Sequence, residues 1–438
     1  MVIYIILYAF VLYFYGNDNK VGVLFSLTTM LFNCFGFVDS SDLILKPSVF
    51  TVSFTFVVSL LEGWKHKNYF NVKNDALSIV ILAIIGYSTF CFLISFITGK
   101  DTLANTFNVV FQNYTLLLYF YFRKMRYSEF VRFFKMVIGA SVVQGVFYYL
   151  QLVGVDGVLT GRVGESSYIN EMTRYANYPL MTTFIAFYYV ISDEVKTLKL
   201  FMIPFFGMML VIGQMRGEII LLGLSCAIFF FMKRKIKYVT YIIVAVLAFQ
   251  FIINPMFEYR SRNATNSTFE EIKIVLSDPT NMYNYYIATG GKGGTMAFRF
   301  AMLMERVQFM ADNPRYLPTG VGCIGENSPN NNFNFIIGTH SEKLDKGISM
   351  LNSADIVWVG VLMYYGLIGV ILFLLFYYFW ARDSLPCAKN SNKDIFVAAS
   401  IFSVSSFLIS FNSDPLRAYS LIVIVFYLSV IYSCKRYS

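Results

Sequence analysis

Long runs of apolar residues fill most of this chain, and they restrict its fold more than any other feature. Many runs reach the roughly 20 residues that a helix needs to cross a hydrocarbon core of about 30 Å. Lipid offers no partner to an unpaired backbone amide, so the spanning elements must be helices. Of the 438 residues, 57% are hydrophobic and 14% are charged, whereas soluble domains carry roughly 25% charged residues. The sequence therefore predicts an all-α polytopic membrane protein.

The apolar runs divide the chain into three parts. About thirteen runs can be counted, which predicts about 12 to 14 transmembrane helices. Residues 1–253 hold the first ten of them, residues 254–352 form one large and partly helical loop, and residues 353–438 hold the C-terminal helices.

Basic residues gather in five short clusters between the apolar runs. These clusters are Lys65–Lys73, Arg123–Lys135, Lys233–Lys237, Arg382–Lys393 and Lys435–Arg436. Even numbers of spans separate them, so all five can share one side of the membrane, which the positive-inside rule makes the cytoplasmic side. The net charge of +9 is then a topology signal, and we expect no nucleic-acid partner. The large loop and the C-terminus fall on opposite sides, with the loop outside.

The segment Thr295–Gly322 has the clearest pattern in the large outer loop. It predicts an amphipathic helix that stops at Asn313, because Pro314 disfavours helical geometry in the residue before it. Arg299 and Arg306 are seven residues apart and so share one face of that helix. Guanidinium groups bind phosphate oxygens through paired hydrogen bonds, which indicates an anionic ligand such as a diphosphate. An ordinary surface helix with neighbouring carboxylates as partners is the alternative.

Other outward-facing arginines are candidate ligand-binding residues as well. Arg216 lies in a short outer turn, where the positive-inside rule does not account for an arginine. An interfacial anchor, or an ion pair with the nearby Glu218, is the alternative interpretation. Arg162 in the outer loop 154–177 and Arg315 after the helix are assigned assisting roles.

Two residues compete as the general base. His340, in the large loop, is one of two histidines in the chain, and its pKa range suits the deprotonation of a hydroxyl group at neutral pH. Asp355 precedes the next span, at the membrane boundary, where a carboxylate costs free energy and tends to be functional. The chain has no P-loop, no HExxH and no paired Cys/His spacing for zinc. Nucleotide-driven transport and metalloprotease activity are therefore disfavoured, and neither a metal nor a cofactor is expected.

Three short patterns follow one another along the outward-facing segments. They are an arginine-glycine step, an arginine-proline-glycine pattern and a glycine pair in the following span: Arg216-Gly217; Arg299, Asn313-Pro314 and Gly320-Val321-Gly322; and Gly366 with Gly369. In this order they resemble the O-antigen polymerase and O-antigen ligase superfamily of bacterial envelope glycosyltransferases. Two positions depart from that family's pattern. Leu303 stands where an aromatic residue is usual, and Asp355 stands where members often carry a histidine.

The resemblance implies a GT-C-like glycosyltransferase of the bacterial inner membrane, with its active site facing the periplasm. Its substrates would be undecaprenyl-diphosphate-linked oligosaccharides, and a chain-length regulator protein is a candidate partner. Polymerisation of the repeat units, for O-antigen or a related surface polysaccharide, is favoured over ligation of a glycan to lipid A core. A flippase for lipid-linked oligosaccharides is the alternative from another class, but the internal repeats typical of such transporters are not seen.

The resemblance also assigns roles to the candidate residues. Arg216 and Arg299, assisted by Arg306 or Arg162, would neutralise the diphosphate as it leaves. The acceptor hydroxyl would lose its proton to His340 or to Asp355.

Overall fold

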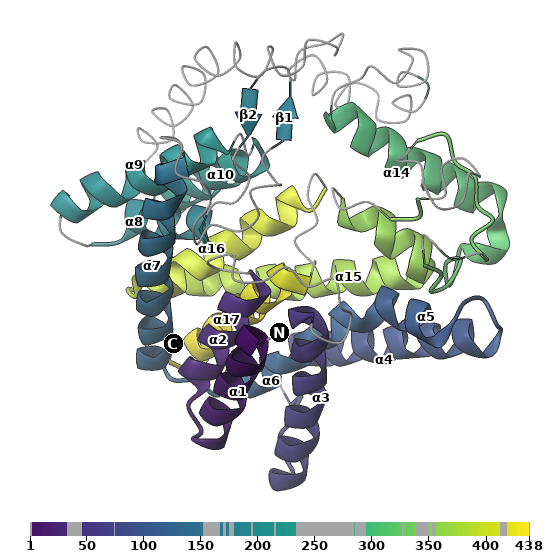
Figure 1. The fold of residues 1–438 in the computed structure, drawn as a ribbon, viewed down its shortest axis with the longest axis horizontal. Helices are drawn as coiled ribbons and strands as arrows, with labels where there is room; N and C mark the ends of the chain where they lie inside the picture. The colour runs from purple at the N-terminus through teal and green to yellow at the C-terminus, as the bar shows by residue number, and fades with distance from the viewer. Residues whose placement is uncertain are drawn as a thin grey trace.

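The computed structural model describes residues 2–32, 46–73, 75–151, 167–169, 172–174, 179–193, 196–213, 216–233, 284, 295–325, 328, 330–337, 350–352, 356–411 and 418–437. The described chain is mainly helical (Figure 1). Its N-terminal helices are α1 (Val2–Gly16), α2 (Lys20–Leu31), α3 (Pro47–Lys65), α4 (Ala76–Ile97), α5 (Leu103–Val110), the 3₁₀ helix η3 (Phe111–Leu117), α6 (Leu118–Phe122) and α7 (Tyr127–Leu150). Helices α8 (Thr182–Ile191), α9 (Lys196–Ile212) and α10 (Arg216–Met232) follow. The last third contains α14 (Thr295–Asp312), the 3₁₀ turn η7 (Pro314–Tyr316), α15 (Val357–Asn390), α16 (Asp394–Ile409) and α17 (Ala418–Tyr437).

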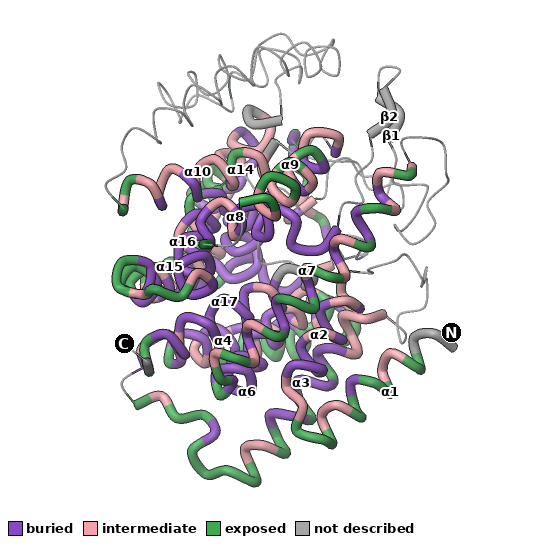
Figure 2. Tube along the Cα trace, turned by 90° about the vertical axis from the view of Figure 1, so that its left-hand side faces the viewer, coloured by how far each residue is buried: buried purple, intermediate pink, exposed green. Residues whose placement is uncertain are grey.

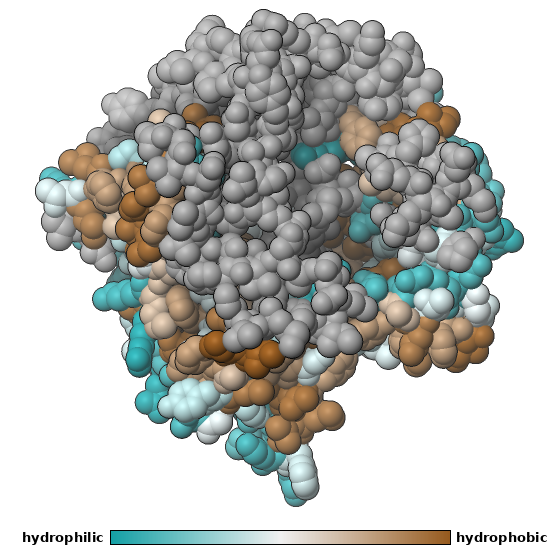
Figure 3. All heavy atoms as spheres, viewed as in Figure 1, coloured by the Kyte–Doolittle hydropathy of each residue, from teal (hydrophilic) through white to brown (hydrophobic). Residues whose placement is uncertain are grey.

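Four of the described helices are long and apolar enough to cross a membrane, namely α3, α4, α7 and α15. Several shorter apolar helices accompany them, among them α2, α8 and α16. Large apolar side chains also remain exposed, such as Ile97 and Leu103, and apolar atoms cover the surface where α4 meets α5 (Figure 3). An apolar surface of this kind is suited to lipid. The chain therefore has the helices of a membrane protein, and the number of spans beyond these four stays a prediction.

The core is built around α15. This helix lies against α4, α16 and α17, and all of its first ten residues are buried (Figures 1 and 2). It bends at Gly366, where φ is +63° and ψ is −160°. A segment of the large loop is seated at this bend.

Residues 102–122 form one of the apolar runs counted above as a spanning helix, but the structure does not make them one continuous helix. The run divides into α5, η3 and α6, and η3 has the tighter 3₁₀ geometry. Such a stretch inside a helical run often marks a functional element or local strain. Here the run contains Asn105, Asn108, Gln112 and Asn113, whose polar side chains favour a packed, protein-facing environment over lipid.

The loop 154–177 contains a short antiparallel hairpin that the sequence patterns did not predict. Strand β1 (Ser167–Ile169) pairs with β2 (Met172–Arg174), and Tyr168 lies opposite Thr173. The all-α prediction is right for the described helical framework. The hairpin is a local addition to one predicted outer loop.

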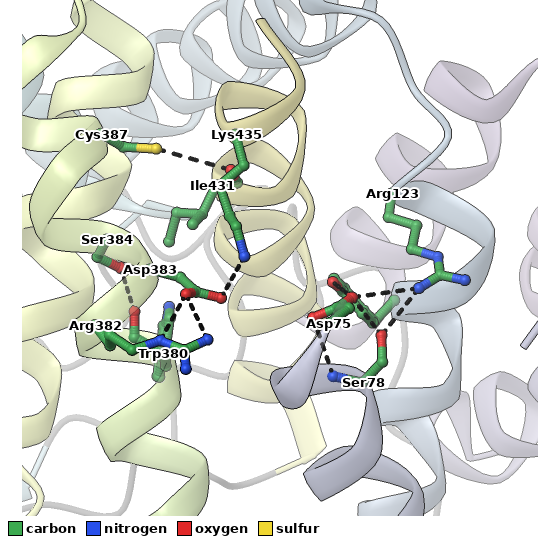
Figure 4. A network of polar contacts seen from close by, with 11 residues as sticks. Asp75, Ser78, Arg123, Trp380, Arg382, Asp383, Ser384, Cys387, Ile431 and Lys435 are labelled. Atoms are coloured by element: carbon green, nitrogen blue, oxygen red, sulfur yellow. Dashed lines mark hydrogen bonds and ion pairs between the residues drawn. The ribbon is translucent and has the colours of Figure 1, made fainter. Parts of the chain in front are cut away.

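Charged side chains from distant segments meet at one end of the bundle (Figure 4). The buried Arg123 lies 3.4 Å from Asp75 and donates to the Ser78 hydroxyl at 2.9 Å. Its guanidinium also lies 5.3 Å from the ring centroid of Tyr432 on α17. On the same helix, Lys435 pairs with Asp383 at 2.9 Å.

The first basic cluster belongs to that same end. Arg123 donates to the backbone carbonyls of Tyr69 at 2.9 Å and Asn71 at 3.1 Å, and both residues lie within that cluster. The structure thus brings together residues from four of the five predicted cytoplasmic clusters. This agrees with the predicted topology, in which these clusters share one side. Residues 234–237 of the remaining cluster lie outside the described chain.

Candidate functional site

Helix α14 and the chain after it form a compact unit, which we call the docked segment (residues 295–337 as far as they are described). The helix ends at Asp312, directly before Asn313-Pro314, so the predicted stop is confirmed. Phe309 on α14 stacks on Tyr316 with ring centroids 6.0 Å apart and packs edge-on against Phe335 at 5.4 Å. These aromatic contacts fold the chain after the proline back onto the helix.

A buried ion pair fastens the end of the docked segment to α14. Glu305 accepts hydrogen bonds from the backbone amides of Ile336 at 2.7 Å and Ile337 at 3.1 Å. Its neighbour Arg306 is fully buried, contacts Glu305, and donates to the carbonyls of Ile337 at 2.9 Å and Met350 at 2.7 Å. The guanidinium also stacks on Phe335, 3.7 Å from the ring centroid. These contacts make Arg306 a positioning residue for the chain that returns toward α15.

The turn after η7 is seated in the bend of α15. The amide of Val321 donates to the carbonyl of Met363 at 2.8 Å, and the amide of Leu367 donates to the carbonyl of Leu317 at 2.8 Å. Gly320, with φ +75°, and Gly366 face each other closely. A Cβ on Gly366 would lie 2.4 Å from the Gly320 nitrogen, and a Cβ on Gly320 would lie 2.5 Å from the Met363 carbonyl oxygen. Only glycine fits either position.

A second contact holds the docked segment against the connection between α4 and α5. Lys100 donates to the carbonyl of Val321 at 2.6 Å, and the amide of Cys323 donates to the Ser95 hydroxyl at 2.8 Å. Asp101 accepts a hydrogen bond from the amide of Gly325 at 2.9 Å. The turn is thereby held between α4 and α15, two helices that also contact each other.

Asp101 is buried, yet its carboxylate accepts several hydrogen bonds. Burial by itself would raise the pKa, but hydrogen bonds from the Asn105 side chain and from the amides of Gly325 and Thr102 outweigh it and hold the pKa below its ordinary value. Asp101 therefore favours docking most strongly when it is ionised.

We expect the Asp101→Asn variant to unfold at a lower temperature than the wild type at pH 7, because one of two carboxylate acceptors is lost at a cost of about 1 to 3 kcal/mol. The lowered pKa gives the wild type a stabilising contribution that is complete above the unfolded-state pKa of about 3.9 and disappears as the pH falls through the folded-state value. The difference in unfolding temperature between wild type and variant should therefore shrink below about pH 4. Thermal unfolding scans from pH 7 to pH 3 measure this difference, and a variant of the exposed Asp312, Asp312→Asn, is the control. A difference that stays constant over this range would contradict the role of Asp101.

Cys323, in the same turn, does not offer a nucleophile. Burial raises the pKa of its thiol to about 12, so the thiol stays protonated at neutral pH and reacts poorly. Among the described residues, no three His, Cys, Asp or Glu side chains come together as metal ligands.

A pocket of about 380 Å³ opens beside the docked segment. Its wall consists of α5, η3, the beginning of α15 and the loop residues Gly325 and Ser328. Among the described residues that line it, five carry carboxamide side chains and none carries a formal charge; the carboxamides are Asn105, Asn108, Gln112, Asn113 and Asn352. Tyr364, Tyr365 and Phe373 add aromatic surface.

The predicted site residues fall into two groups. Arg299 lies half-buried on α14, on the face it shares with Arg306 two turns further along. Arg315 is exposed, and its guanidinium lies 4.6 Å from the ring centroid of Tyr316. Arg216 begins α10, but its side chain is outside the described part of the structure. His340, Asp355 and Arg162 also lie outside the described residues.

Two details bear on these predictions. Glu218, the candidate ion-pair partner of Arg216, accepts a hydrogen bond from the Thr183 hydroxyl at 2.6 Å. Asn352 and Val357, on either side of Asp355 in the sequence, both line the carboxamide pocket. Whether Arg216 meets Arg299 around one diphosphate, and which residue is the base, stay predictions.

The carboxamides of the pocket were not singled out in the sequence, although a signal was present. Asn105, Asn108 and Gln112 recur at intervals of three and four residues, which places them on one helical face. Polar side chains at this spacing inside an otherwise apolar run indicate a face turned toward protein or water. Only the structure shows that α15 and the docked segment complete the pocket.

Comparison with known proteins assigns the chain to no family. No protein-family model matches the chain, and no curated protein matches it.

Proposed function

We propose that the protein is a polymerase of undecaprenyl-diphosphate-linked oligosaccharide repeat units, acting at the outer face of a bacterial inner membrane. The observation that carries the proposal is the docking of residues 317–322 in the bend of α15 at Gly366. This contact unites two of the patterns on which the resemblance to the O-antigen polymerase and ligase superfamily rests. Gly320 and Gly366 each leave room for the backbone of the other segment, so both patterns serve one contact.

In the proposed reaction, the acceptor hydroxyl attacks the anomeric carbon of the donor sugar. Its proton passes to the base, His340 or Asp355, while the new glycosidic bond forms. The bond between the anomeric carbon and the phosphate oxygen breaks, and the lipid diphosphate departs with the electron pair. Arg299, with Arg216, neutralises the charge that develops on the leaving group. No metal is needed in this scheme.

The buried ion pair gives Arg306 a different part from the one assigned to Arg299. Its guanidinium is already engaged by the carbonyls of Ile337 and Met350 and by the ring of Phe335. A diphosphate would have to displace these contacts in order to reach it. We therefore propose that Arg306 holds the docked segment in place and that Arg299 neutralises the departing diphosphate.

A test in cells separates a polymerase from a transporter. When the gene is deleted, the proposal expects single lipid-linked repeat units to accumulate at the outer face and long glycan chains to disappear. Units are located by their accessibility to a glycosidase added to intact spheroplasts. Units confined to the cytoplasmic side would instead identify a flippase and overturn the proposal.

A further inference from the structure

We propose that the carboxamide pocket binds one neutral sugar of the glycan that is being extended, an inference that rests on the proposed function. The pocket lies beside the docked segment, between α5, η3 and the beginning of α15. Its volume of about 380 Å³ falls in the range of roughly 300 to 1,000 Å³ that is typical of small-molecule sites.

The chemistry of the lining selects the class of ligand. A carboxamide offers both donors and acceptors, as does each hydroxyl of a sugar, so the two groups pair well. The described lining has no charged side chain, which disfavours a diphosphate, because that group is bound by arginine or lysine. A polyprenyl tail is equally disfavoured, since its burial would leave the amides of Asn108 and Gln112 without partners. Aromatic side chains such as Tyr364 and Phe373 provide flat apolar surface for the carbon faces of a sugar ring.

Two of the amides are fixed by the protein itself. Asn105 donates to Asp101 at 2.9 Å. Asn113 donates to the hydroxyls of Ser88 at 2.9 Å and Tyr365 at 3.0 Å. These bonds build the wall of the pocket and hold its shape.

The amides of Asn108 and Gln112 remain available to a ligand. Within the described part of the chain, the side chains of Asn108 and Gln112 have no hydrogen-bond partner, and both line the pocket. Asn108 is exposed and Gln112 is half-buried, so a ligand can reach them from outside. Asn352 also lines the pocket, and its side chain lies against Gly360, where a Cβ would be 2.5 Å from the Asn352 side-chain oxygen.

The position of the pocket fits an acceptor or donor sugar. Its wall includes Gly325 and Ser328 of the docked segment, which also carries Arg299 on α14. A sugar bound there would be held by the same unit that holds the arginine. Neutral sugar and charged diphosphate would then be recognised by separate groups of residues.

The test measures the two kinds of binding separately on the purified full-length protein. One probe is the neutral oligosaccharide released by mild acid from the organism's own lipid-linked units, and the other is undecaprenyl diphosphate. The double variant Asn108→Ala/Gln112→Ala should bind the oligosaccharide at least about tenfold more weakly, from the loss of two amide hydrogen bonds. Its affinity for undecaprenyl diphosphate should not change. Asn330→Ala, which alters an exposed asparagine outside the pocket, is the matched control.

Three results would overturn the inference. If the wild type extends chains and the double variant binds the oligosaccharide as tightly as the wild type, the pocket is not a sugar site, while the proposed function stands. If the double variant loses both ligands equally, the amides support the fold and do not recognise sugar. If the wild type neither extends chains nor binds the oligosaccharide, the proposed function fails and the inference fails with it.

Discussion

Replacement of Arg299 by alanine is expected to slow chain extension about 100- to 1,000-fold, the range found when one group that stabilises developing charge is removed from an active site. Arg299 is half-buried on a helix whose later turns are fixed by the Glu305–Arg306 pair and by the aromatic packing of Phe309. Its guanidinium is therefore presented from a rigid support. The rate is measured with purified protein and lipid-linked repeat units at saturating substrate.

Two companion variants make this result specific. Arg299→Lys keeps the charge but loses the planar pair of donors, so we expect an intermediate rate. Arg132→Ala removes an exposed arginine from α7, far along the chain from the docked segment, and should retain the wild-type rate. An Arg299→Ala protein that folds normally and extends chains at the wild-type rate would rule out Arg299 as the group that stabilises the leaving diphosphate.

Replacement of Gly366 by alanine should destabilise the protein by about 2 to 6 kcal/mol and abolish chain extension. Two costs add. The backbone at φ +63° and ψ −160° lies in a region that is essentially restricted to glycine, at roughly 1 to 3 kcal/mol for another residue. The new Cβ would also lie 2.4 Å from the Gly320 nitrogen, and overpacking of this kind costs about 1 to 3 kcal/mol.

The matched control for this variant is Gly86→Ala on α4. A Cβ at Gly86 meets nothing within 4 Å, and alanine in a helix is more stable than glycine by roughly 0.5 to 1 kcal/mol. Thermal unfolding in detergent measures both variants, and hydrogen exchange at residues 317–322 reports whether the turn stays docked. If Gly366→Ala unfolded at the same temperature as Gly86→Ala, with the turn equally protected, the reciprocal glycine contact would have no energetic importance.

The elements that local rules control were predictable from the sequence. One of the apolar runs counted in the sequence covers residues 75–97, and helix α4 spans Ala76–Ile97, because run length and lipid burial determine such a helix. The end of α14 at Asp312 follows from the proline two residues later. The shared face of Arg299 and Arg306 follows from helical geometry alone.

The contacts that give the site its shape were not predictable in the same way. Periodicity places Arg306 on a face but does not reveal what covers that face, and the structure fills it with Phe335 and the carbonyls of Ile337 and Met350. The contact between Gly320 and Gly366 joins segments far apart in the chain. The carboxamide pocket likewise needs α5 and α15 to be adjacent, which no local pattern specifies.

The most direct measurement is chain extension by the purified protein supplied with lipid-linked repeat units alone. The proposal predicts a ladder of lipid-linked products, each longer by one repeat unit, with one undecaprenyl diphosphate released per bond formed. Product lengths are read by gel electrophoresis and mass spectrometry, and Arg299→Ala serves as the inactive reference. A folded protein that forms no product beyond the single unit, or that forms a product only when lipid A core is added, would contradict the assignment as a polymerase.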